Sequence, residues 1–174
     1  MAETLTLTDW TAMDKVLVHA PAAGSLAGRL GVGFGRAQRR GDGTLVVRVQ
    51  PGQWLLFAPP GRAPELVEEW QAAAGDEFVS VLDVTSGRAL FRLTGDAGPA
   101  LLAKVCALDL ERAPDGSAQR SSVAEVNAEI VRDDAPAGRR SFLIACDRSF
   151  GRYLFRALAD AGAEFSIHTL EGGT

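Results

Sequence analysis

Short apolar stretches, separated by glycine, proline and aspartate, recur along most of the chain. Stretches of this kind, rich in valine, leucine and phenylalanine, are typical of β-strands. The predicted strands cover residues 16–18, 45–49, 53–58, 78–84, 89–93, 121–131, 141–146 and 164–170. Apolar residues three and four positions apart predict helices over 63–74, 97–106 and 148–161. Together these elements predict an α+β fold in which neighbouring strands pair in an antiparallel way.

The most regular alternation lies in residues 121–131. Apolar side chains occupy most of the even positions, while Glu125, Asn127 and Glu129 occupy odd ones. Because successive side chains of a strand point to opposite faces, the pattern predicts one long strand with a polar stripe on one face. The stripe is either a solvated edge or one wall of a polar pocket.

A repeat relates the two halves of the chain. The strand 54–58 and the helix residues 66–70 match the strand 142–146 and the helix residues 154–158, in both cases at an offset of 88 residues. Each unit runs from a hairpin through a helix to a strand. The repeat predicts two lobes of antiparallel sheet with helices packed on one side of each sheet.

The first part of the chain is less regular. We expect residues 1–43 to form an irregular segment and loop, followed by an α+β domain, 44–174, with lobes at about 44–84 and 85–174. The glycine cluster at 31–35 lacks the third glycine and the following helix that dinucleotide binding requires. It is therefore expected to be a connection, or a surface that becomes ordered against a partner.

Composition restricts the classes of function. The chain has 174 residues, 47% of them hydrophobic and 23% charged, so it can bury a core. Its net charge of −4 disfavours nucleic acid as the natural partner. No charge-free run is long enough to span a membrane, and Met1–Thr4 does not begin a signal peptide. The sequence therefore predicts a cytoplasmic protein.

No catalytic or metal-binding set is apparent. The two cysteines, Cys106 and Cys146, stand apart among apolar residues, and we expect both to be buried and reduced. The two histidines lie near opposite ends of the chain without ligand-like spacing. Asp83 ends a strand at a turn, where an aspartate commonly binds the backbone. We assign no catalytic residue, no metal ligand and no cofactor ligand.

Arginine is the predominant base, with only two lysines in the chain. Arg29, Arg36, Arg39 and Arg40 gather in or next to the glycine-rich segment. Arginine suits planar ion pairs at interfaces, although a solvated loop would also carry such residues. We expect these four residues to belong to a flank that is buried against a large acidic partner.

Longer motifs carry a family resemblance. Residues 84–97 (VTSGRALFRLTGDA) and 101–110 (LLAKVCALDL) resemble a motif of the folate-binding aminomethyltransferase superfamily. The segment 148–161, which begins with Arg-Ser-Phe, and the aromatic strand 53–59 also fit. Together with residues 119–124, at the place of a central strand, they make the chain most similar to gamma subunits of heterotetrameric sarcosine oxidase, over about residues 25–167.

The resemblance implies a non-catalytic subunit of an oxidoreductase. Its partners would be the alpha, beta and delta subunits, which would hold FAD, FMN, NAD and zinc, with tetrahydrofolate as a further ligand of the complex. The complex would convert sarcosine to glycine, peroxide and a one-carbon unit, as formaldehyde or methylene-tetrahydrofolate.

Other functions stay open at this point. The chain could be the equivalent subunit of a related N-methyl amino acid oxidase or dehydrogenase, or a small transferase with an unrecognised site. It could also be a free-standing tetrahydrofolate-binding domain, in which Asp83, Glu125 or Asn127 meets the pterin.

Overall fold

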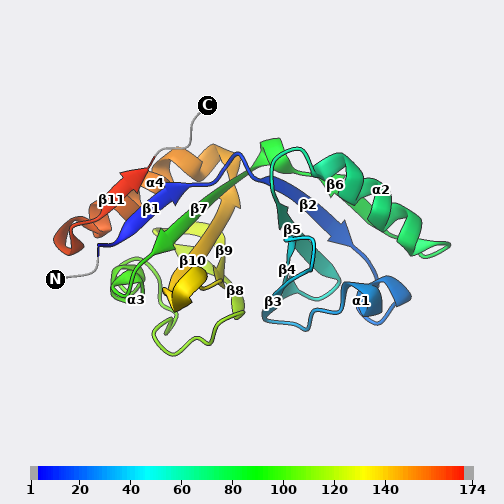
Figure 1. The fold of residues 1–174 in the computed structure, drawn as a ribbon, viewed down its shortest axis with the longest axis horizontal. Helices are drawn as coiled ribbons and strands as arrows, with labels where there is room; N and C mark the ends of the chain where they lie inside the picture. The colour runs from blue at the N-terminus through cyan, green and yellow to red at the C-terminus, as the bar shows by residue number, and fades with distance from the viewer. Residues whose placement is uncertain (1–3, 171–174) are drawn as a thin grey trace. The chain divides into compact units, whose positions relative to one another are not determined.

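A computed structural model describes residues 4–170 (Figure 1). The chain forms two units: a middle unit, residues 13–86, and a terminal unit, which joins the described residues 4–12 and 87–170. The sequence instead predicted a separate segment over 1–43 and lobes at about 44–84 and 85–174. The outer ends of these predicted segments, residues 1–3 and 171–174, lie outside the described residues.

The middle unit is a five-stranded antiparallel sheet with two helices. Its strands follow the spatial order β3-β4-β5-β2-β6. In chain order its elements are β2 (Asp14–His19), α1 (Ser25–Leu30), β3 (Arg36–Arg39), β4 (Leu45–Gln50), β5 (Gln53–Ala58), α2 (Ala63–Ala74), β6 (Ser80–Asp83) and the 3-10 turn η1 (Thr85–Gly87).

The core of the middle unit lies between the helices and one face of this sheet. Leu66, Trp70 and Ala74 recur every four residues along α2 and are buried, so they form one stripe of the helix. They belong to the same core cluster as Trp54 and Leu56 of the central strand β5. Burial of this stripe stabilises α2 against the sheet.

The terminal unit contains a six-stranded sheet in the order β11-β1-β7-β10-β9-β8. β11 pairs parallel to β1, and the other pairs are antiparallel. Its elements are β1 (Thr6–Asp9), β7 (Arg88–Thr94), α3 (Gly98–Leu102), β8 (Ala118–Val123), β9 (Val126–Arg132), β10 (Ser141–Asp147), α4 (Gly151–Ala161), β11 (His168–Leu170) and the 3-10 turns η2 (Pro136–Gly138), η3 (Arg148–Phe150) and η4 (Ala163–Phe165).

Helix α4 packs closely on its sheet. Leu154 and Leu158 of α4 are fully buried in one cluster with residues of β7 and β10. The ring centroids of Phe91 and Phe155 lie 5.3 Å apart in an edge-to-face contact. A Cβ atom at Gly151 would lie 2.8 Å from the Cβ of Ala89. The first residue of α4 must therefore be glycine for the helix to approach the sheet this closely.

The predicted repeat is present in both units. β5 and β10 are central strands that begin 88 residues apart, and α2 and α4 begin at the same offset. The order β3-β4-β5-β2 in one sheet corresponds to β8-β9-β10-β7 in the other. This confirms the predicted α+β fold, with helices on one side of each sheet.

The predicted long strand 121–131 is wrong. β8 and β9 form an antiparallel hairpin in which Val123 pairs with Val126. Ala124 and Glu125 make the turn with φ angles of 47° and 67°. Val123 and Val126 lie on the same face, so the inward positions change from odd to even across the turn; the apolar Ala124 conceals this change, and the two turn residues are not the usual Asn-Gly or Asp-Gly. The pattern therefore contained no break.

The expectation of an irregular segment before residue 44 is also wrong in its elements. β1, β2, α1 and β3 all lie there, although only a short strand over 16–18 was predicted. β3 was missed because it is an edge strand in which only Ala37 is buried. Shorter differences occur at the ends of elements: the predicted helix 97–106 reduces to Gly98–Leu102, and the predicted strand 164–170 divides into η4 and β11.

The turn at Glu125 allows a direct test of backbone strain. Glu125 is exposed and has a positive φ, which a residue with a Cβ atom adopts at a cost. We expect Glu125→Gly to raise the free energy of unfolding by about 0.5–1 kcal/mol, measured by urea denaturation. Asn127→Gly, on an exposed position of regular strand β9, should lower it by about 0.5–1 kcal/mol. Equal effects of both substitutions would contradict the assignment of the turn.

Candidate partner-binding surface

The three residues considered for a pterin site do not form one site in either unit. Asp83 lies at the end of β6 in the middle unit, where its Oδ1 accepts a hydrogen bond of 2.9 Å from the backbone N–H of Thr85. Glu125 and Asn127 are exposed in the β8–β9 hairpin of the terminal unit. Asp83 thus performs the ordinary turn chemistry that its position suggested.

An open depression of about 540 Å³ lies beside Glu125. Backbone and side chains of residues 103–107 form one wall, and Ser121, Ser122 and Ala124 of the hairpin form part of the other. Its polar groups are two serine hydroxyls, one lysine and one carboxylate. It resembles a surface hollow more than the largely apolar, enclosed sites that hold small molecules.

The third member of the predicted polar stripe has a structural role. Glu129 is 3% exposed, and its carboxylate pairs with the guanidinium of Arg88. Arg88 also binds Asp147 at 2.9 Å. Because a buried charge requires a partner, these contacts explain how a carboxylate is accommodated inside the sheet. The stripe is therefore not one wall of a continuous polar pocket.

Another arginine of β7 is buried, and it links this strand to one residue that follows β1 and one that follows β9. Arg92 of β7 is 8% exposed and lies over the ring of Trp10, with 4.5 Å from its Cζ to the ring centroid. It also donates hydrogen bonds to the carboxylate and the backbone carbonyl of Asp133. These contacts satisfy the guanidinium inside the unit, so Arg92 is not available to a ligand.

The arginines predicted to meet a partner differ in their surroundings. Arg40 pairs with Glu69 at 2.8 Å and lies 4.9 Å above the ring of Trp70. Next to it, Asp42 accepts a hydrogen bond from the backbone N–H of Thr44, which is the main reason why its pKa is lowered. Arg40 is thus part of the packing of the middle unit and not of a free loop.

The other three predicted arginines are exposed. Arg29 lies in the last turn of α1, and Arg36 and Arg39 lie on the edge strand β3. Arg39 donates a hydrogen bond of 2.8 Å to the carbonyl of Gly43. A depression of about 420 Å³, lined in part by Arg39, Arg40 and Val32, lies beside them. The structure therefore leaves Arg29, Arg36 and Arg39 accessible at this side of the middle unit.

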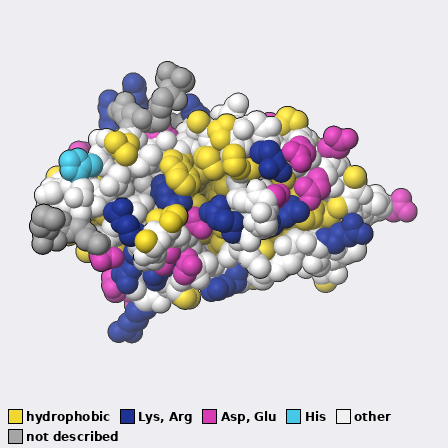
Figure 2. Space-filling model, in the orientation of Figure 1, with side chains coloured by type: hydrophobic (Ala, Val, Ile, Leu, Met, Phe, Trp, Pro, Cys, Tyr) yellow, Lys and Arg dark blue, Asp and Glu magenta, His cyan; other side chains and the backbone are white. Residues whose placement is uncertain are grey.

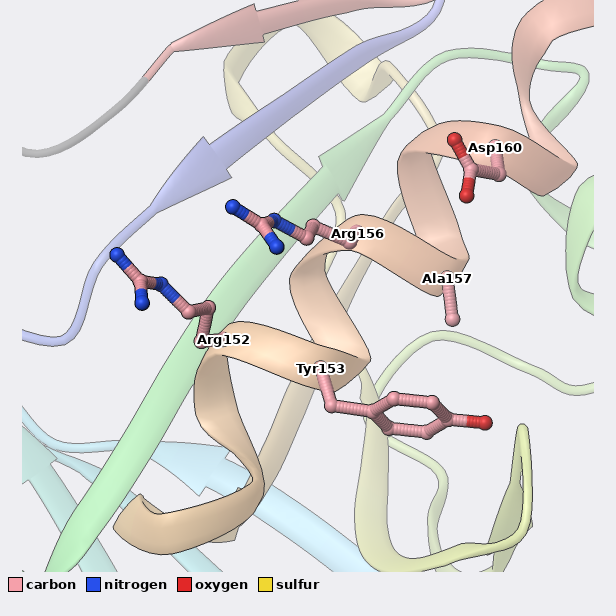
Figure 3. Close-up of a pocket in the computed structure, with 5 residues that line it drawn as sticks. All are labelled: Arg152, Tyr153, Arg156, Ala157 and Asp160. Carbon is pink, nitrogen blue, oxygen red and sulfur yellow. The ribbon is translucent and has the colours of Figure 1, made fainter.

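Sequence reasoning missed a further surface on the outer side of α4. A depression of about 430 Å³ is lined by Arg152, Tyr153, Arg156, Ala157 and Asp160. Figure 3 shows the two guanidinium groups extending to one side of the helix and the Tyr153 ring to the other. The spacing of four between the arginines was visible in the sequence, but the helix was considered only for its apolar face.

Charges of both signs are interspersed on the face of the molecule drawn in Figure 2.

Within residues 4–170, no cluster of histidine, cysteine and acidic side chains is suited to hold a metal ion. Among the described helices, none combines the length and the apolar character needed to cross a membrane.

Comparison with solved structures identifies the type of fold. The chain matches glycine cleavage system aminomethyltransferase T from Bartonella henselae with a TM-score of 0.76 and 18% identity, covering 96% of this chain and 48% of that one. It matches a chain of heterotetrameric sarcosine oxidase from Corynebacterium sp. U-96, in complex with pyrrole 2-carboxylate, with a TM-score of 0.81 and 27% identity, covering 95% and 87%. The protein therefore has an aminomethyltransferase-like fold.

Sequence comparison identifies the family. Residues 37–164 match the family described as sarcosine oxidase, gamma subunit. The chain is 33% identical to the sarcosine oxidase subunit gamma of Corynebacterium sp. (strain P-1), over 95% of this chain and 83% of that protein. It is 30% identical to the subunit gamma of an Arthrobacter species, over 87% and 73%. The chain belongs to the sarcosine oxidase gamma subunit family, as the sequence motifs predicted.

The surroundings of Arg40 predict a loss of stability on its substitution. Arg40→Ala removes the ion pair with Glu69 and the contact with Trp70, so we expect the free energy of unfolding to fall by about 1–2 kcal/mol. Arg29→Ala, at an exposed position without an ion pair to a described residue, should change it by less than about 0.5 kcal/mol. Urea denaturation of both variants checks this. Equal stability of the two would show that Arg40 is solvated.

The burial of both cysteines predicts that they react slowly with thiol reagents. Both are buried and free, and burial raises the pKa of Cys146 to about 11. At pH 8 an unperturbed thiol with a pKa of 9.0 is roughly 10% thiolate, whereas Cys146 would be roughly 0.1% thiolate. We expect both thiols of the folded chain to react slowly with a disulfide reagent, and both to react rapidly in denaturant. Rapid labelling of both without denaturant would contradict their burial.

Proposed function

We propose that the chain is the gamma-type subunit of a heterotetrameric, flavin-dependent sarcosine oxidase, assembled with alpha, beta and delta subunits. The observation that supports this most strongly is the match to a chain of the Corynebacterium sarcosine oxidase, which covers 95% of this chain and 87% of that one. A match over nearly the full length of both chains favours the same role in an assembly over a shared fold alone.

The proposed complex oxidises the N-methyl group of sarcosine. Two electrons and two protons pass from the N-methyl group to oxygen, which becomes hydrogen peroxide. Water then hydrolyses the resulting imine to glycine and formaldehyde, or tetrahydrofolate takes up the methylene carbon as methylene-tetrahydrofolate and releases glycine. In this proposal FAD, FMN, NAD and zinc belong to the partner subunits. The residues of this chain serve assembly, and none is assigned a step in the oxidation.

The proposal includes a cytoplasmic location. Two free cysteines, Cys106 and Cys146, lie buried in the terminal unit and are not paired. Unpaired thiols are the usual state of cysteine in a reducing compartment. This supports the expectation drawn from the sequence.

A free-standing tetrahydrofolate-binding domain is the second candidate. The aminomethyltransferase-like fold and the depression beside Glu125 favour it. Against it, the carboxylate of Asp83 accepts a hydrogen bond from the backbone N–H of Thr85. A related N-methyl amino acid oxidase would use the chain in the same way as the sarcosine enzyme, with a different substrate in the partner subunits.

Coexpression tests the proposed function. The affinity-tagged chain is produced with the alpha, beta and delta subunits from the same source, and the purified material is assayed for peroxide formation with sarcosine and with N-methylglutamate. We expect stoichiometric copurification of all four chains and activity with sarcosine.

Three outcomes would contradict this proposal. If the tagged chain purifies without the other three chains, it is not a subunit of this complex. Higher activity with N-methylglutamate than with sarcosine would indicate the related enzyme. Calorimetric titration of the isolated chain with tetrahydrofolate should give no heat of binding, whereas one-to-one binding would favour the second candidate.

A further inference from the structure

The arginines directly before α4 and within it differ from most others in the described chain because they form no ion pair with a described residue. No carboxylate of a described residue lies within ion-pair distance of Arg148, Arg152 or Arg156. Elsewhere, acidic groups lie within 4 Å of Arg40, Arg62, Arg88, Arg92, Arg112, Arg120, Arg132 and Arg140. Arg148, Arg152 and Arg156 follow one another at intervals of four residues, so three guanidinium groups without an ion pair to a described residue stand at the start of one helix and within it, in a chain with more acidic than basic residues.

Their position within the helix is electrostatically unfavourable for the isolated unit. Arg148 lies in η3 directly before α4, and Arg152 lies in the first turn of α4, which contains no acidic residue. The amino-terminal end of a helix carries partial positive charge, so cations there are destabilising. Arg152 and Arg156 are also like charges four residues apart, which repel each other. An anionic partner at this end would relieve both effects.

Aromatic side chains border the arginines. Phe150 and Tyr153 are 51% and 53% exposed, although the opposite side of α4 is fully buried. In Figure 3 the small side chain of Ala157 follows Tyr153 along the helix, and Asp160 lies near the far end. The depression of about 430 Å³ lies among these residues, so a side chain of another protein could pack beside the tyrosine ring. Tyrosine and arginine are the residues enriched where interfaces bind most strongly.

We propose that the outer face of α4, formed by Arg148, Phe150, Arg152, Tyr153 and Arg156, is a docking surface for an acidic segment of a partner subunit. This inference rests on the proposed function and gives it a location in the terminal unit. Carboxylates of the partner pair with the arginine side, and an apolar or aromatic side chain enters the depression beside Tyr153.

The charge of the whole chain favours a protein partner over nucleic acid or an anionic membrane. Polyanions bind through clustered positive charge, whereas this chain carries a net charge of −4. The face of one helix is also smaller than the roughly 800 Å² that each partner buries in a stable complex. The α4 surface is therefore one part of a larger interface.

Charge reversal in the coexpressed complex tests the inference. Arg152→Glu/Arg156→Glu is compared with Arg112→Glu/Arg139→Glu, which causes the same change in net charge at two other exposed arginines. We expect the amount of copurified partner to fall at least tenfold for the α4 pair and to stay within twofold for the control pair. Tyr153→Ala should weaken copurification about tenfold, and Arg152→Lys/Arg156→Lys should have a smaller effect than charge reversal.

Further measurements separate docking from stability. The melting temperature of the isolated α4 pair variant should stay close to that of the wild-type chain, because both positions are exposed and Arg152→Glu places an acidic residue in the first turn of the helix. Raising the salt concentration from about 0.1 to about 0.5 M should weaken assembly of the wild type more than that of the variant.

The outcomes separate this inference from the proposed function. Failure of the wild-type chain to copurify overturns the proposed function, and the inference falls with it. Full copurification of both the wild type and the α4 pair variant overturns the inference alone. The wild-type chain and the variant are also tested for binding to phosphatidylglycerol vesicles and to RNA. If the variant assembles normally but does not bind a vesicle or RNA that the wild type binds, the α4 surface is assigned to a membrane or nucleic acid instead.

Discussion

Burial of one helix stripe against the central strand of each sheet is the contact on which the structure depends. In the middle unit, Leu66 and Trp70 of α2 share a core with β5, and in the terminal unit Leu154 and Leu158 of α4 share a core with β10. A small sheet exposes too much apolar surface unless a helix covers it, so each repeat must contain both elements. The requirement also fixes which side of α4 faces outward, and therefore which arginines a partner can reach.

This contact explains which parts of the fold the sequence could predict. α2 was predicted at its exact bounds because its apolar spacing, proline start and glycine end agree. The β8–β9 hairpin was not predicted, since Ala124 and Glu125 adopt positive φ angles without the residues that normally announce such a turn. β3 was not predicted because an edge strand with one buried side chain has no apolar pattern to detect.

The candidate sites were harder to predict than the elements, because pairing decides the role of a charged side chain. Glu129 appeared as part of a surface stripe, but it pairs with Arg88 inside the sheet. Arg40 appeared as a loop residue, but it packs over Trp70. The arginines of α4 gain their significance only because they form no ion pair with another described residue. Sequence motifs, in contrast, predicted the family; the longest of them lie in β5, β7 and α4.

In the proposed complex, α4 uses its inner side for the core of the terminal unit and its outer side for a partner subunit. Hydrogen–deuterium exchange of the free chain and of the assembled complex tests it most directly. We expect peptides covering residues 148–157 to become strongly protected on assembly, while the β8–β9 turn at 124–125 exchanges equally in both states. Unchanged exchange over 148–157 in a complex that contains the chain would contradict it.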